Sequence, residues 1–239
     1  MPLPPRFSIA LLAGCGVLAT STTSFADSLA NGVEVGFRSG YSLPFGNLSA
    51  YEGMGALFDG VVPIWVDAGY RTPHLYVGAF FQYGLVLVSG DPLNGCSATN
   101  VMCTGSDVIA GIDLQAHLFP DGRFDPWAGV GAGYEWVNVA SSTSSTSGPS
   151  SVAPSATSNA SINGWQLVNL QLGLDFKDPV VMPGLGIGPF VMLGVGQYTN
   201  ASGANNNNTF ISGTLPSQAL HEWLTIGIRG AYDIHLGGS

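Results

Sequence analysis

The chain has 239 residues, of which 46% are hydrophobic and only 9% are Asp, Glu, Lys or Arg, with a formal net charge of −9. Soluble globular domains carry about 25% charged residues, so this composition argues against an ordinary soluble protein. The acidic balance also argues against nucleic acid as a partner, because phosphate binding needs clustered cations. No internal apolar stretch reaches the length of about 18 residues that a membrane helix requires. A mean hydropathy of +0.30 without such a helix indicates short membrane-crossing strands.

The N-terminus is typical of a secretory signal peptide. Arg6 precedes an apolar stretch over residues 7–19, and residues 24–26 (SFA) fit the small-x-small cleavage rule. Residues 12–15 (LAGC) also resemble a bacterial lipobox, in which Cys15 would be lipidated. We expect cleavage after Ala26, and both alternatives imply export.

Eight segments alternate apolar and polar residues with period two, which predicts β-strands with one apolar face. They cover residues 32–43, 61–71, 74–88, 106–119, 126–139, 164–177, 186–198 and 222–236. In the last segment Ile226 and Ile228 share one face, whereas Arg229 and Asp233 lie on the other. The third and seventh segments are apolar on both faces, so the sequence leaves their orientation open.

The connections between these segments alternate between long and short. The long ones cover residues 44–60, 89–105, 140–163 and 199–221, and the short ones 72–73, 120–125 and 178–184. This alternation puts every long loop at one end of the strands and both termini at the other. Outer-membrane barrels have this asymmetry, with short periplasmic turns and long extracellular loops. Polar low-complexity tracts at 141–161 and 199–208 support exposure of the long loops.

The charged residues indicate which strand face is buried. If the sheet closes, its backbone groups are paired and the apolar face can meet lipid, which leaves the polar face inside. Nearly every charge outside loops and turns has this inward parity: Glu34, Arg38, Asp67, Asp113, Glu135, Asp175, Arg229 and Asp233. Aromatic residues at the ends of the apolar face predict an interfacial girdle, with Tyr41, Tyr134 and Trp136 on the loop side and Tyr70 and Phe176 on the turn side.

The first and last strands become neighbours when the barrel closes, which brings Arg38 close to Arg229. We expect these arginines to pair with Glu34, Asp67, Asp113 or Asp233. Because carboxylates outnumber arginines in this set, some carboxylates need hydration or a proton. The remaining cations of the mature chain, Arg71, Arg123 and Lys177, are assigned to the short-turn end.

Two cysteines, Cys96 and Cys103, follow the signal peptide in a polar loop. In an oxidising compartment we expect them to form a disulfide, with two free thiols as the alternative. Neither a His nor a further Cys lies nearby, which argues against a metal site there.

The stretches GVEVGFRSGYSLPFG (32–46) and GVVPIWVDAGYR (60–71) make the chain similar to the small outer-membrane β-barrels of Gram-negative bacteria, the class of the OmpA transmembrane domain. The resemblance implies an all-β, eight-stranded antiparallel up-and-down transmembrane barrel over residues 27–239, after a signal peptide over 1–26. It also implies extracellular loops, periplasmic termini, outer-membrane lipids as surroundings and insertion by the barrel-insertion machinery. The C-terminal aromatic residue usual in such barrels is missing from Ile234–Ser239.

An eight-stranded barrel is only wide enough inside for side chains to fill it, which argues against a wide pore. The leading hypothesis is therefore a non-enzymatic barrel with a plugged polar lumen, a structural or surface-display role, an unknown extracellular partner of its loops, and no cofactor or metal.

Three alternatives remain open: a lipid-modifying hydrolase, a narrow cation channel and a soluble lipocalin-like binder. The hydrolase would use His221 and Glu222 near Ser217, and the pairs Asp113–His117 and Asp233–His235 could serve as acid–base groups or metal ligands. The long loops contain no Lys or Arg, so we expect weak binding of lipopolysaccharide phosphates.

Overall fold

The computed structural model describes residues 32–49, 52–88, 101–143, 157–178, 180, 182–204, 210–215 and 218–235. Eight long strands form the wall of a barrel: β1 (Gly32–Ser49), β3 (Phe58–Arg71), β4 (Leu75–Val88), β5 (Val101–His117), β6 (Phe124–Thr143), β7 (Thr157–Lys177), β8 (Leu185–Ala204) and β10 (Leu220–His235). Three short elements lie at one end: β2 (Glu52–Gly53), the 3-10 turn η1 (Met54–Ala56) and β9 (Phe210–Thr214). In this part of the chain no helix is long and apolar enough to cross a membrane. The predicted signal peptide lies outside the described residues.

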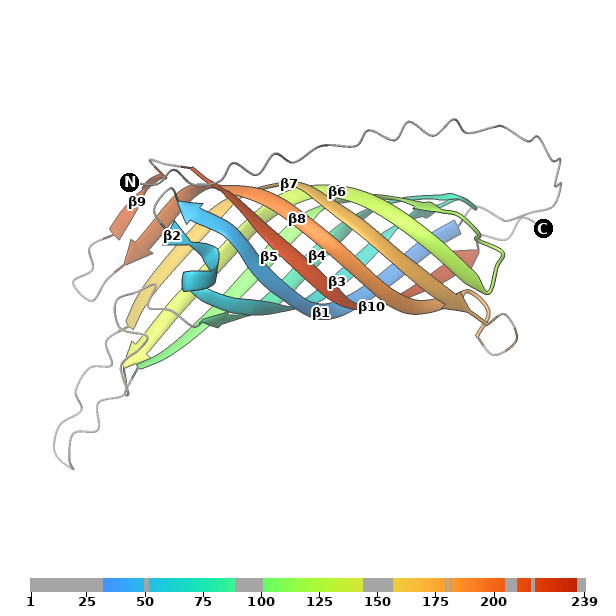
Figure 1. Ribbon diagram of the computed structural model, residues 1–239, viewed down its shortest axis with the longest axis horizontal. Coiled ribbons are helices and arrows are strands. Elements are labelled where there is room, and N and C mark those ends of the chain that lie inside the picture. Colours follow the sequence, from blue (N-terminus) through green and yellow to red (C-terminus); the bar gives the residue numbers. More distant parts are fainter. Residues whose placement is uncertain are drawn as a thin grey trace, which may run out of the picture.

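The sheet closes on itself, as Figure 1 shows by the strands inclined around one long axis. Each long strand pairs antiparallel with its neighbours in the chain, and β10 pairs with both β8 and β1. Arg38 of β1 lies directly opposite Arg229 of β10 in this closing pair. The prediction of an eight-stranded up-and-down barrel is therefore confirmed. Closure pairs the backbone groups of every long strand on both sides, as a membrane-spanning sheet requires.

We call the end with the connections 72–74, 118–123 and 178–184 the turn end, and the end with η1, β2 and β9 the loop end (Figure 1). Residues of one parity point outward and are mostly apolar. Exposed side chains include Phe37, Ile64, Val77, Phe81, Leu114, Val130, Leu172, Ile226 and Ile228. Residues of the other parity point into the lumen and include nearly all the buried charges. The barrel is thus apolar outside and polar inside.

The strands reach further toward the loop end than the alternation predicts. β6 continues to Thr143 and β7 starts at Thr157, and the polar residues Ser141 and Ser142 pair with Ser158 and Thr157. The hydrogen bonds of an antiparallel ladder join backbone groups. Residues with hydroxyl side chains can therefore continue a strand once the neighbouring strand is in register. Composition alone therefore overestimated the length of this loop.

A β-bulge in β7 also departs from strict alternation. Gln166 and Asn169 both face the lumen although they are three residues apart, while Leu167 points outward. The register with β6 and β8 shifts at the same point. A bulge adds one residue to one strand, so residues on its two sides exchange parity.

The two strands that are apolar on both faces, β4 and β8, contribute apolar side chains to the lumen. Phe80 of β4 and Phe190 and Met192 of β8 pack there with Trp65, Ile109 and Trp127. The lumen therefore contains an apolar layer as well as charged ones, which explains why the sequence pattern of these strands was ambiguous.

Candidate functional site

The lumen holds the densest set of polar groups and is the candidate functional site. Near the turn end, the Arg229 guanidinium lies 2.6 Å from an Asp175 carboxylate oxygen and also forms an ion pair with Glu34. Arg229 Nη2 donates a further hydrogen bond of 3.0 Å to Gln115 Oε1. The guanidinium carbon stands 4.6 Å from the centre of the Trp127 ring. Charge, hydrogen bonds and an aromatic face thus all hold Arg229 in place.

A second group of charges closes the turn end itself. Arg71 pairs with Glu34 and lies 3.5 Å from Asp125. Asp125 also lies 2.9 Å from His117 Nδ1 and 2.7 Å from Lys177 Nζ. Arg71 lies at the turn end as predicted, and its side chain is only 7% exposed and points into the barrel, which the prediction did not include. Its parity, shared with Asp67 on the same strand, could have indicated this.

Arg38 forms the middle layer of the network. Its Nη2 lies 3.0 Å from Asp67 and 3.2 Å from Asp113, and its Nη1 donates a 2.6 Å hydrogen bond to Gln171 Oε1. Its guanidinium carbon lies 4.7 Å from the ring centre of Trp65. The two arginines that face each other across β1 and β10 therefore take different carboxylates, which keeps the like charges apart.

A third group lies toward the loop end and is centred on Glu135. Tyr198 donates a 2.6 Å hydrogen bond to Glu135 Oε1, and Trp223 Nε1 donates to the same oxygen at 3.2 Å. His221 Nε2 lies 2.9 Å from Glu135 Oε2, and its ring stacks on Tyr198 at 3.9 Å. Three side chains from β8 and β10 thus satisfy one carboxylate of β6.

Beyond Glu135, apolar side chains close the loop end of the lumen. We call this group the mouth cluster: Met54, Leu57, Phe58, Val61, Val86, Val137, Val139, Tyr198 and Trp223. Met54 comes from η1 and is fully buried. The segment that contains η1 therefore packs apolar side chains into the loop end of the lumen.

Seven of the eight predicted lumen residues are 2% exposed or less: Glu34, Arg38, Asp67, Asp113, Glu135, Asp175 and Arg229. Asp233 is the exception, since it is only half-buried and its Oδ1 has no hydrogen-bond partner. Of the four carboxylates expected as arginine partners, Asp67 and Asp113 pair with Arg38 and Glu34 pairs with Arg229. Asp233 forms no ion pair within the described residues, and Asp175 pairs with Arg229 as well. The candidate list was restricted to charges and left out the buried carboxylates Asp107 and Asp125. It also left out the buried amides Gln82, Gln115, Gln166, Asn169 and Gln171, of which Gln115, Asn169 and Gln171 lie on the face that alternation assigns to the lumen.

The predicted girdle residues lie on the outer face. Tyr41, Tyr70, Trp136 and Phe176 are 38%, 45%, 37% and 46% exposed. Tyr134 packs against Trp136 at 4.7 Å and against Trp165 at 5.0 Å, which adds an aromatic residue that the prediction did not include.

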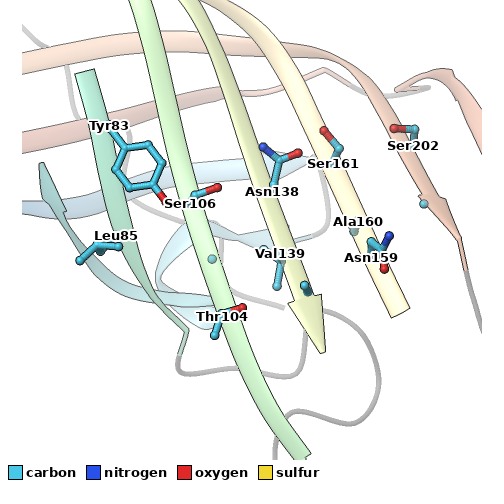
Figure 2. A pocket seen from close by; sticks show the side chains of 13 residues that line it. Tyr83, Leu85, Thr104, Ser106, Asn138, Val139, Asn159, Ala160, Ser161 and Ser202 are labelled. Atoms are coloured by element: carbon cyan, nitrogen blue, oxygen red, sulfur yellow. The ribbon is translucent and has the colours of Figure 1, made fainter. Parts of the chain in front are cut away.

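A groove of about 750 Å³ lies on the outer side of β4 to β8. Figure 2 shows the side chains that line it. Uncharged residues line it, among them Tyr83, Thr104, Ser106, Asn138, Asn159, Ser161 and Ser202. Hydroxyl and amide groups here replace the apolar side chains found nearer the middle of the barrel. On β6 the apolar outer band therefore ends at this level, whereas β4 still exposes Leu85 and Leu87.

The described residues among those proposed for the alternative chemistries are arranged differently from what those hypotheses require, and the pair Asp233–His235 stays a prediction. His221 is 1% exposed and faces Glu135 inside the lumen, so it does not lie on the outer surface; Ser217 lies outside the described residues. His117 pairs with Asp125 rather than with Asp113. Within the described ranges, no three His, Cys, Asp or Glu side chains form a metal-binding group. Cys103 is disulfide-bonded, and Cys96 lies outside the described residues.

Comparison with known proteins relates the chain to outer-membrane barrels by structure. A major outer membrane protein from Thermus thermophilus is 15% identical, with 86% of this chain and 100% of that chain covered and a TM-score of 0.50. The outer membrane protein OprG from Pseudomonas aeruginosa is 14% identical, with 86% and 97% covered and a TM-score of 0.47. Neisserial surface protein A is 10% identical, with 83% and 95% covered and a TM-score of 0.42.

No family model matches the chain, and no curated protein matches it by sequence. The fold and the inside-out arrangement of its side chains nevertheless define the class: a small eight-stranded transmembrane β-barrel of the outer-membrane type.

Proposed function

We propose that this protein is a closed, non-enzymatic outer-membrane barrel with a structural or surface-display role. The observation that carries the proposal is the filled lumen. Arg38 and Arg229 cross the interior in ion pairs, and the mouth cluster seals the loop end. An interior of this kind stabilises the barrel and leaves little room for a solute.

We further propose that the loop end is extracellular and that both termini are periplasmic. Short turns and long loops are distributed in this way in bacterial outer-membrane barrels. The partners that follow are outer-membrane lipids around the apolar band, the barrel-insertion machinery, and an extracellular partner for the segments beyond the strand ends. Nucleic acid is not expected, because the net charge is −9.

Planar-bilayer recordings test closure directly. We expect the purified wild-type barrel to give no conductance steps, because both the ion-pair layers and the mouth cluster block the lumen. Arg38→Ala is the matched probe, since it alters the lumen and leaves the outer face unchanged. Steps in wild type whose size changes in Arg38→Ala would establish ion flow through the lumen and overturn the proposal in favour of the channel alternative.

The hydrolase alternative has its own assay. We expect no release of fatty acid from phospholipid vesicles by the reconstituted barrel. Hydrolysis that disappears in His221→Ala but persists in His74→Ala would contradict a non-enzymatic role, since His74 lies at the turn end, far from the loop-end group.

A further inference from the structure

Among the fully buried carboxylates of the described residues, Asp107 has no cation beside it. Seven carboxylates are buried in the described structure (Glu34, Asp67, Asp107, Asp113, Asp125, Glu135 and Asp175) against three arginines (Arg38, Arg71 and Arg229). All three arginines act in the turn-end and middle layers. Asp107 lies in the loop-side half, where Glu135 has His221 as its partner. Asp107 itself is 2% exposed and forms no ion pair within the described ranges.

The surroundings of Asp107 make an uncompensated negative charge on its carboxylate more unfavourable. Ile109 is the register partner of Glu135, and Asp107 is that of Val137, so the two carboxylates are diagonal neighbours on one face of β5 and β6. Diagonal residues on paired strands are close enough to interact. Gln82 Nε2 donates one hydrogen bond of 2.9 Å to Asp107 Oδ2. One neutral donor does not balance a buried carboxylate that faces a second one.

Asp107 lines a small internal cavity whose walls carry oxygen atoms. The cavity measures about 10 Å³, and polar side chains from five strands reach it: Ser42, Gln82, Asp107, Gln166 and Thr225. Asp107 Oδ1 and Gln82 Oε1 are both buried there without a hydrogen-bond partner. The hydroxyls of Ser42 and Thr225 share one hydrogen bond of 2.7 Å and keep free lone pairs. The cavity is about the size of a single water molecule or ion.

We propose that this cavity is a binding site for one small monovalent cation, with Na⁺ as the probe. The ligands are Asp107 Oδ1 and Gln82 Oε1, and the hydroxyl oxygens of Ser42 and Thr225 add further oxygen atoms to the cavity wall. The rest of the wall is apolar or aromatic: Val61, Ile109, Met192 and Trp223. One carboxylate supplies one charge, which matches a monovalent ion. Ca²⁺ takes six to eight oxygens, and Mg²⁺ keeps several waters, so neither suits a cavity of this size.

The site is internal, so the ion enters as the barrel folds. The mouth cluster covers the loop side, where Trp223 belongs to both the cluster and the cavity wall. On the turn side, the layer of Arg38 repels cations. The bound ion is therefore a structural counter-ion rather than a permeating one. Its trapping rests on the proposed closure of the barrel, which the planar-bilayer recordings test separately.

The test compares unfolding of the barrel in NaCl and in choline chloride at equal ionic strength and at pH 8. We expect the thermal midpoint of wild type to rise with Na⁺ concentration and to stay constant in choline, because ligand binding to the folded state alone stabilises it. Asp107→Asn should lose the dependence on Na⁺. Asp233→Asn, which removes a carboxylate at the opposite end of the lumen, should keep it.

If Asp107→Asn folds poorly, the number of Na⁺ ions bound per wild-type barrel can be measured directly instead. Wild type folded in NaCl and desalted into choline chloride should retain about one Na⁺ per barrel by atomic emission, and Gln82→Met should retain less. Equal midpoints in NaCl and choline, or no retained Na⁺, would overturn the proposal. A midpoint that follows pH identically in both salts would mean that a proton neutralises Asp107, which also overturns it.

Discussion

We expect the ion pairs of Arg229 to contribute strongly to the free energy of unfolding of the barrel. Arg229→Met removes the charge but keeps most of the side-chain volume. It leaves Asp175 with a 3.2 Å hydrogen bond from Trp127, and Glu34 with Arg71 alone. Breaking a buried ion pair by removing one partner costs about 3–5 kcal/mol. Loss of the contact with the Trp127 face, at 4.6 Å, adds on the order of 0.5–1 kcal/mol.

The assay is urea unfolding of the barrel in lipid vesicles, followed by tryptophan fluorescence. Arg123→Ala serves as the control, because Arg123 pairs with Asp178 at 3.8 Å with its side chain 76% exposed. Such a surface pair contributes roughly 0–1 kcal/mol. We therefore expect the free energy of unfolding to fall several times further in Arg229→Met than in Arg123→Ala.

A double-mutant cycle separates the ion pair from other effects of the substitution. In an Asp175→Asn background the same Arg229→Met change should cost less, by on the order of 1–3 kcal/mol, because the orphaned carboxylate is no longer there. If Arg229→Met costs no more than Arg123→Ala, or if its cost is the same in both backgrounds, the ion pairs are not what stabilises the lumen.

Three further outcomes are expected. Ile228→Lys, at an exposed position in the middle of β10, should destabilise the folded barrel in lipid by about 2–4 kcal/mol. Ile234→Lys, near the turn end, should cost only roughly 0–1 kcal/mol. Equal costs in vesicle unfolding would contradict the placement of the apolar band. Gly131→Leu would place a Cβ 2.2 Å from Asp113 Oδ1 and should cost about 1–3 kcal/mol in the same assay, but Gly230→Leu, with nothing within 4 Å, should be neutral. Peptide mapping without reduction should link Cys103 to Cys96, and a free Cys96 thiol would refute that pairing.

Much of the fold follows from alternation along the strands. Parity in β10 places Ile226 and Ile228 outside and Arg229 inside, and the structure agrees. The same alternation also predicts an inward-facing side chain for residues that the sequence analysis placed in turns or at the loop end of a strand. Asp125 shares the inward parity of Glu135 on β6, and His221 shares that of Arg229 on β10. Extending each alternation to the strand ends would have found both.

Other features could not be predicted from a single strand at a time. The bulge between Gln166 and Asn169 reverses parity within β7, and only the register with its neighbours reveals it. The partners of each arginine depend on which strands face one another across the lumen, which is why Arg229 contacts Asp175 of β7. Alternation specifies the face of a residue but not the neighbour it meets.

The central claim is that this chain is an inside-out barrel, closed and embedded in the outer membrane. The most direct measurement is the gel mobility of the outer-membrane fraction in SDS, with and without boiling. A closed lipid-facing barrel resists SDS until it is heated, so the account predicts that the unboiled and boiled protein migrate differently. Identical migration, with the protein recovered in the soluble periplasmic fraction, would contradict the account.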